Sequence, residues 1–177
     1  EALSIRKSVF LVPFRAIAEE LFSDLVSKYS DYGLTVVISD RDHREHDESI
    51  MQGQYDLAVV VYEKLSGLLA LNAGLLSGVG LVVADEVQMI MDVSRGPVIE
   101  LLLTQILLNN PSTRVVALSA VLDQLNGFDE WLRARVLLDR TRPIELREAI
   151  YDTDGAVRYR ELNSRKLGSM QLPPWRD

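Results

Sequence analysis

Two adjacent acids, Asp85 and Glu86, close an apolar run of the sequence, and Gln88 follows two positions later. The run GLVVA (80–84) has the composition of a buried strand, so two carboxylates at its end cost desolvation and mutual repulsion. A magnesium ion with a nucleotide phosphate would compensate, with one carboxylate facing the metal shell and its neighbour polarising a water for in-line attack. The alternative is structural: Asp85 caps a helix and Glu86 lies in its first turn.

The segments around these acids predict strands that alternate with helices. Strands are expected at 8–12, 34–39, 56–61, 80–84, 113–119 and 134–138. All but the last show little polar–apolar alternation, which is typical of strands buried on both faces of a parallel sheet. Helices are expected over 17–29, 65–71 and 98–108, with a fourth that Asp123 could cap and that ends with Phe128, Trp131 and Leu132. The pattern predicts an α/β domain with a mostly parallel sheet, whose ligands bind beyond the carboxyl ends of the strands.

The pattern changes after Pro143. Residues 144–151 alternate between polar and apolar types, and residues 156–162 do so again after a turn-forming Asp-Gly pair. An antiparallel β-ribbon extension is therefore expected, followed by a linker. The expected division is an α/β domain over 1–143 and a ribbon with a linker over 144–177.

Composition limits the class of protein. The 177 residues, 47% hydrophobic and 25% charged, suit one globular domain. No apolar run approaches the roughly 20 residues that span a bilayer, so no membrane partner is expected. The chain has no cysteine, which excludes a disulfide partner and fits the cytoplasm, and its net charge of −7 argues against a wholly basic nucleic-acid binder. Without an initial methionine, the chain is expected to be a piece of a longer protein.

Several short motifs stand in a fixed order along the chain. They are Val12-Pro13-Phe14-Arg15-Ala16, Tyr62-Glu63-Lys64, Asp85-Glu86-Val87-Gln88, Ser119-Ala120-Val121 and the stretch WLRARVLLDRTRPIELREAIY (131–151). In this order they resemble motifs Ia, Ib, II and III, and the exit from the first domain, of superfamily-two helicases of the DExH, Ski-type branch. The resemblance covers nearly the whole chain, and it implies the first RecA-like domain, of P-loop NTPase type, with helices on both faces of the sheet.

The resemblance implies roles for these residues in an ATP-dependent helicase that uses ATP and Mg²⁺. Asp85 would position the magnesium ion through water, Glu86 would act on the attacking water, and Gln88 would bridge the nucleotide site to a second RecA-like domain. Ser119, Ala120 and Val121 would couple hydrolysis to strand separation. Residues of motifs Ia and Ib would grip the backbone of single-stranded DNA or RNA: Pro13, Phe14, Arg15, Tyr62, Glu63 and Lys64.

The residues of motifs Ia and Ib also have ordinary structural interpretations. Pro13 and Tyr62 stand where a strand passes into a helix, and the free N–H groups of a helix start can bind phosphate without reading bases. Arg15, however, could lie on a solvated helix face. Lys64 could pair with an acid of its own helix, and the ring of Tyr62 could pack in the core.

Three departures separate the chain from the family pattern. The phosphate-binding G-x-x-x-x-G-K-[ST] loop is absent from the sequence, so this fragment alone is expected neither to bind ATP tightly nor to hydrolyse it. Gln88 replaces the usual histidine and cannot titrate. Val121 replaces the motif III threonine and lacks its hydroxyl.

Two other functions remain open. A non-catalytic family member could keep the fold and serve as a scaffold or nucleic-acid clamp, which the departures at Gln88 and Val121 support. An unrelated flavodoxin-like binding domain would give Asp85 and Glu86 no role. The pair His43 and His46 could hold a metal ion on one helix face, but its acidic surroundings favour a solvated loop or helix start.

Overall fold

The computed structural model describes residues 7–120, 127–139 and 144–174. The chain forms two compact units, Glu1–Arg135 and Val136–Asp177. Val121 and the expected helix cap Asp123 lie outside the described residues. The division of the chain into functional domains stays a prediction.

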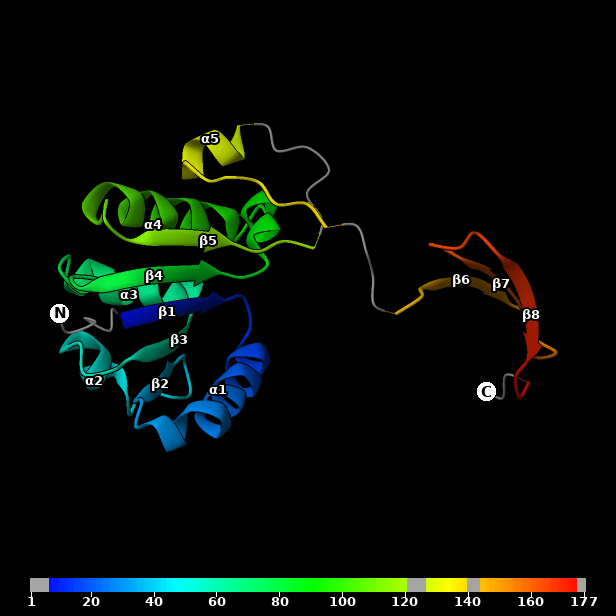
Figure 1. Ribbon diagram of the computed structural model, residues 1–177, viewed down its shortest axis with the longest axis horizontal. Helices are drawn as coiled ribbons and strands as arrows, with labels where there is room; N and C mark the ends of the chain where they lie inside the picture. Colours follow the sequence, from blue (N-terminus) through cyan, green and yellow to red (C-terminus); the bar gives the residue numbers. More distant parts are fainter. Residues whose placement is uncertain (1–6, 121–126, 140–143, 175–177) are drawn as a thin grey trace. The chain divides into compact units, whose positions relative to one another are not determined.

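A five-stranded parallel sheet forms the centre of the first unit (Figure 1). Its strands are β1 (Lys7–Val12), β2 (Val36–Ser39), β3 (Leu57–Val61), β4 (Val79–Ala84) and β5 (Arg114–Ala117). They lie in the order β2-β3-β1-β4-β5, and every neighbouring pair is parallel. This confirms the α/β fold expected from the alternating pattern. β1 is central, and β2 and β5 form the edges.

Helices follow the strands. They are α1 (Arg15–Tyr29), α2 (Asp47–Met51), α3 (Tyr62–Leu71), α4 (Gly96–Asn109) and α5 (Phe128–Leu132), with short 3-10 helices η1 (Ser30–Tyr32) and η2 (Val87–Met91). Buried side chains of α1 pack with those of one sheet face, whereas buried side chains of α3 and α4 pack with those of the other. The sheet therefore has helices on both faces, as predicted.

Alternate residues of β1 and β3 enter different cores. Val9 and Leu11 of β1 belong to the cluster that includes α3 and α4, while Phe10 and Val12 join the cluster of α1. Apolar side chains are therefore needed on both sides of the strand, and the sequence shows a continuous apolar run instead of alternation. This burial fixes the strand ends from which the motif residues project.

The second unit is a small antiparallel sheet in the order β6-β7-β8. Its strands are β6 (Arg147–Tyr151), β7 (Ala156–Glu161) and β8 (Leu167–Gln171). The first two confirm the expected ribbon, but β8 was not predicted, because Gly168 and Ser169 weaken its strand pattern. Pairing with β7 places Gly168 beside the Tyr159 ring, where a Cβ atom would lie within 2.4 Å of that ring.

The strand expected at 134–138 does not form, so that prediction was wrong. These residues have no regular secondary structure, and the side chains of Leu137 and Leu138 are 82% and 69% exposed. An apolar run becomes a strand only where a neighbouring strand accepts its backbone hydrogen bonds, and among the described residues this segment has none. None of the helices within the described residues has the length and apolar character needed to span a membrane.

Candidate functional site

The predicted motifs lie side by side along the carboxyl end of the sheet. Because the strands are parallel, their carboxyl ends all lie at this same end. From one side of the sheet to the other, the residues that follow the strands are Asp40 after β2, Tyr62 after β3, Pro13 after β1, Asp85 after β4 and Ser119 close after β5. The strand order thus interleaves segments that lie far apart in the sequence.

Asp85 and Glu86 are half-buried at the end of β4. The Asp85 backbone N–H donates to the Leu11 carbonyl at 2.9 Å, and the Asp85 carboxylate accepts the Glu86 N–H at 2.9 Å. Glu86 has a left-handed backbone with φ of 50°, which is uncommon outside glycine and occurs at functional sites. The helix-cap interpretation does not fit, because η2 has no side-chain cap.

The two carboxylates lack an ion-pair partner among the described residues. No lysine or arginine there forms an ion pair with Asp85 or Glu86. Two adjacent, half-buried carboxylates without a counterion suit a divalent cation, and carboxylate oxygens and water are the ligands that Mg²⁺ prefers. The donor set therefore fits the magnesium ion that the sequence implies.

Gln88 connects the acids to the next strand. Its side-chain N–H group donates to the Glu86 carboxylate, and its side-chain oxygen accepts the Ser119 hydroxyl at 2.7 Å. Backbone bonds run parallel to this link, since the Val87 N–H donates to the Leu118 carbonyl at 2.9 Å. A neutral amide can donate and accept at once, so Gln88 spans both partners without titrating. Ala120 follows Ser119, whereas Val121 lies outside the described residues.

The Tyr62 side chain is fully buried. Its hydroxyl donates to the Asp85 carbonyl at 2.7 Å, which joins motif Ib to motif II. Burial, reinforced by the nearby Asp85 charge, raises the pKa of Tyr62 well above its ordinary value, so the hydroxyl stays a donor. The ring packs in the core, as the structural interpretation expected, so Tyr62 could contact nucleic acid only through its backbone.

The basic residues of motifs Ia and Ib each have an acidic partner. Lys64 lies 2.5 Å from Asp47 at the start of α2. Its partner therefore belongs to another helix, whereas the structural interpretation placed it on the helix of Lys64 itself. Asp47 also accepts the Ser39 hydroxyl at 2.5 Å. Arg15 pairs with Asp42, and both side chains are more than half exposed. Exposed pairs are weak, so Arg15 remains free to exchange Asp42 for a phosphate.

A pocket of about 290 Å³ opens beside these motifs. Its lining includes Pro13, Phe14, Arg15 and Glu63 from motifs Ia and Ib. It also includes two arginines that the sequence analysis missed, Arg41 and Arg95. Arg95 precedes α4, and its only local signal is the Gly-Pro pair that opens that helix. Three arginines at one pocket provide positive charge suited to phosphate.

Glu63 is held by Arg95. The Arg95 Nε atom donates to the Glu63 carboxylate at 2.6 Å. Burial acts to raise the pKa of Glu63, but the Arg95 hydrogen bond and charge, with a backbone bond, outweigh burial and leave that pKa below its ordinary value. Glu63 is therefore an anion in a pocket with three arginines, and it pairs with Arg95.

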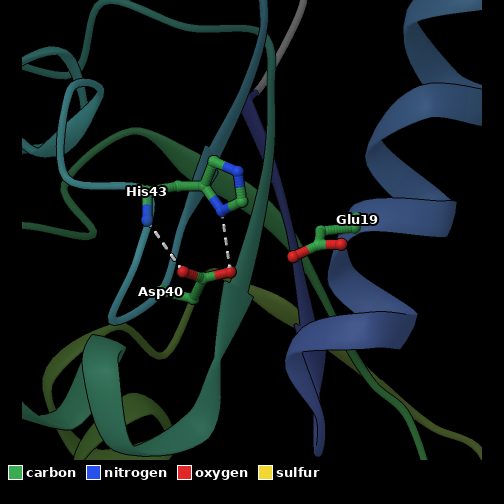
Figure 2. Close-up of side chains that lie close together, drawn as sticks. All are labelled: Glu19, Asp40 and His43. Atoms are coloured by element: carbon green, nitrogen blue, oxygen red, sulfur yellow. Dashed lines mark hydrogen bonds and ion pairs between the residues drawn. The ribbon is translucent and has the colours of Figure 1, made fainter.

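A second cluster lies at the end of β2. Figure 2 shows Glu19 of α1 pointing toward Asp40 and His43. The Asp40 carboxylate is fully buried, accepts the backbone N–H groups of Asp42 and His43 at 2.7 and 2.9 Å, and lies 3.1 Å from the His43 Nδ1 atom. His43 lies in this loop and His46 immediately precedes α2, so the two histidines do not share a helix face as the metal interpretation required.

This cluster predicts a pH-dependent stability. The Asp40 hydrogen bond raises the pKa of His43 above 6.5, and the charges of Asp40, Glu45 and Glu19 act in the same direction, while burial opposes them. A raised folded-state pKa means that the ion pair stabilises fully below pH 6.5 and is lost as the pH rises through the raised value. Urea unfolding should show stability falling with pH across this window in the unmodified chain and a flatter profile in His43→Gln. Equal slopes would contradict the prediction, and Glu19→Gln should lower the pKa of His43 measured by NMR.

Comparisons with known proteins agree with this arrangement. Residues 3–127 match the family model described as DEAD/DEAH box helicase. The chain is similar to three curated proteins named ATP-dependent DNA helicase Hel308: 35% identical over 149 residues in Methanocaldococcus jannaschii, 34% over 154 in Caldivirga maquilingensis and 36% over 148 in Thermoplasma acidophilum. These alignments cover 84%, 87% and 84% of the chain but only 12%, 20% and 22% of those relatives.

Proposed function

The chain belongs to the DEAD/DEAH box helicase family, and on that premise we propose that it is the first RecA-like domain of a longer ATP-dependent helicase or translocase. The observation that carries this proposal is the link from Glu86 through Gln88 to Ser119, which joins the predicted catalytic acids to the predicted coupling motif. Family membership excludes the unrelated flavodoxin-like domain considered above. The similar relatives are named DNA helicases, so we propose single-stranded DNA as the track.

The two acids would divide the chemistry of hydrolysis between them. Bound Mg-ATP would supply the reactive phosphate and the charge that neutralises it in the transition state. Asp85 would hold the magnesium ion through water, while Glu86 would accept a hydrogen bond from the attacking water and orient it. The two carboxylates have different partners, since Asp85 accepts the Glu86 N–H and Glu86 accepts the Gln88 side-chain N–H, which allows the two roles to be separate.

Motifs Ia and Ib would hold the DNA backbone. α1 and α3 begin directly after Phe14 and Val61, and neither N-cap residue makes a side-chain hydrogen bond, so the N–H groups of these first turns, apart from that of Glu63, are available for phosphate. Pro13 and Phe14 would shape the surface, and the side chains of Arg15 and Lys64 would add positive charge. Such contacts bind the backbone without selecting a sequence.

The nucleotide would lie between this domain and a second RecA-like domain of the same protein. That partner would contribute an arginine to the transition state, and Gln88 lies on the route by which the site could sense it. In this proposal residues 1–143 belong to the first domain, residues 144–177 lead toward the second, and the protein acts in the cytoplasm. RNA in place of DNA is the alternative track.

Residues 1–177 alone are proposed to be inactive as an ATPase. Their sequence contains no G-x-x-x-x-G-K-[ST] loop, which supplies the backbone N–H groups and the lysine that hold the β- and γ-phosphates. Calorimetry should detect no tight Mg-ATP binding by this fragment. Micromolar affinity would overturn this part of the proposal without affecting the full-length protein.

The deciding experiment measures ATP hydrolysis by the full-length protein with and without single-stranded DNA or RNA oligonucleotides. DNA-stimulated hydrolysis is the expected result, and stimulation by RNA alone would reassign the track. Binding without any stimulated hydrolysis would favour the rival function, a scaffold or clamp that keeps the fold, which the departure from histidine at Gln88 supports.

The Gln88–Ser119 hydrogen bond should contribute to that stimulation. Ser119→Ala is expected to lower DNA-stimulated turnover about threefold, since an exposed neutral hydrogen bond contributes about 0.7 kcal/mol. In a double-mutant cycle, Gln88→Ala with Ser119→Ala should lose no more than the greater single loss. Gln88→Ala with Ser66→Ala on α3 serves as the control pair and should be additive. Additive losses at Gln88 and Ser119 would show that they do not act as a unit.

A further inference from the structure

The Arg95 guanidinium bridges three segments of the first unit. Its Nε atom donates to the Glu63 carboxylate and one terminal nitrogen donates to the Pro13 carbonyl, both at 2.6 Å. The Arg95 Cζ atom also lies 5.1 Å from the centre of the Phe14 ring, within the range of a cation–π contact. The other terminal nitrogen lies 3.9 Å from the Met89 sulfur. One side chain thus contacts motif Ia, motif Ib and the η2 helix that follows motif II.

Arg95 is itself held in place by its own loop. The Asp92 carboxylate accepts the backbone N–H groups of Ser94 and Arg95 at 2.9 and 2.8 Å. On the other side, Gly96 is buried against Ile90, with no room for a side chain between them. The backbone at Arg95 is therefore fixed relative to η2, and its side chain is only about one-fifth exposed.

The two helix starts that Arg95 contacts have no side-chain cap of their own, although Tyr62 and Lys64 bond α3 to Asp85 and Asp47. α1 begins after Phe14 and α3 begins after Val61 without a side-chain hydrogen bond to cap either helix. Both starts belong to the surface proposed to hold the DNA backbone. A bond to the Pro13 carbonyl and a bond to Glu63 fix these two starts at a set separation, because a planar guanidinium holds its donors in a rigid fork.

We propose that Arg95 is a positioning residue that locks motifs Ia and Ib into a single DNA-binding surface. The inference rests on the proposed function, which assigns DNA to that surface. Two of the donor nitrogens of Arg95 are used within the protein and its charge is paired with Glu63, so it acts on DNA through the segments it holds. The simplest alternative is that Arg95 attracts phosphate directly as one more positive charge.

Whether removal of Glu63 tightens or weakens DNA binding distinguishes these two explanations. Glu63 carries a negative charge in a pocket with Arg15 and Arg41, so its removal should tighten DNA binding if only charge matters. If Glu63 acts as the anchor for Arg95, its removal should weaken binding despite the more favourable charge. Arg95→Lys gives a second test, because lysine keeps the charge but lacks the planar fork.

The test measures DNA binding and ATP hydrolysis by the full-length protein. Fluorescence anisotropy with labelled oligodeoxythymidylate gives the dissociation constant, and hydrolysis assays give the half-saturating DNA concentration and the turnover at saturating DNA. Arg95→Ala is expected to weaken binding about tenfold, Arg95→Lys nearly as much and Glu63→Ala about fivefold. These substitutions should raise the half-saturating DNA concentration more than they lower the turnover at saturating DNA. Arg15→Ala, which removes an exposed charge from the same pocket, serves as the matched control and should weaken binding only about twofold.

Each outcome decides the inference. Full binding by Arg95→Lys, or tighter binding by Glu63→Ala, would show a charge effect and overturn the positioning role. If thermal unfolding shows that Arg95→Ala does not fold, Arg95→Lys and Glu63→Ala still decide between the explanations. A wild-type protein that binds neither DNA nor RNA would overturn the proposed function, whereas wild-type DNA binding with unaffected variants would overturn the role of Arg95 alone.

Discussion

Replacing Glu86 by glutamine in the full-length protein is expected to lower DNA-stimulated ATP hydrolysis by about 10²- to 10³-fold, the usual loss when a catalytic acid–base group is removed. Glutamine keeps the length of the side chain and can still bond Gln88, so the link to Ser119 need not break. It has no negative charge and cannot accept a proton from the attacking water. Steady-state hydrolysis at saturating DNA and ATP measures the loss.

A matched control and a binding measurement make this result specific. Glu100→Gln changes an exposed glutamate of α4 in the same unit and should leave hydrolysis unchanged. Nucleotide binding by Glu86→Gln should persist, because the proposed metal contact belongs to Asp85. A Glu86→Gln protein with more than half of normal activity would show that Glu86 does not orient the water. Inactivity of the unmodified protein would instead favour the scaffold.

Gly96→Ala is expected to destabilise the first unit by about 2–3 kcal/mol, at the upper end of what overpacking a buried site costs. A Cβ atom at Gly96 would lie 2.2 Å from the Ile90 carbonyl oxygen, and a backbone atom cannot turn aside as a flexible side chain can. The start of α4 or the η2 helix would have to shift. Since η2 follows Asp85 and Glu86 directly, the same shift would disturb the position of motif II.

The glycine of α3 provides the control for this experiment. Gly67 lies on the exposed face of its helix, and a Cβ atom there would meet nothing within 4 Å. Gly67→Ala should therefore stabilise the chain by about 0.5–1 kcal/mol, because alanine loses less backbone entropy in a helix. Urea unfolding of both variants measures the two changes. Destabilisation of similar size at both positions would show that close packing at Gly96 is not the cause.

The amino-acid sequence by itself determined the strands of the parallel sheet and the end of the sheet at which the motifs lie. Continuous apolar runs such as 57–61 predict strands covered on both faces, and the cores on the two sides of the sheet confirm this. The carboxyl ends of parallel strands lie at the same end of a sheet, so acids that follow a strand, such as Asp85, could be placed there without coordinates. These inferences succeeded because they depend on neighbouring residues and on a general rule of sheet geometry.

Other features depended on partners that are distant in the sequence. β8 forms because β7 pairs with it, whereas the more apolar segment 134–138 has no strand beside it among the described residues. At the position of Tyr62, an exposed aromatic ring could have stacked on a base. The strand order, however, places β3 and β4 on either side of β1, and this brings the Tyr62 hydroxyl within reach of the Asp85 carbonyl. Lys64 likewise finds Asp47, which precedes it by 17 residues.

Arg95 shows most clearly what only the tertiary structure decided. Its partners Glu63 and Pro13 are 32 and 82 residues away, and no pattern in the residues around it indicates them. A local sequence restricts which backbone conformations are favourable, and this is enough to predict a helix or a strand. Which side chains meet across the sheet depends on strand order and packing, which the whole chain determines together.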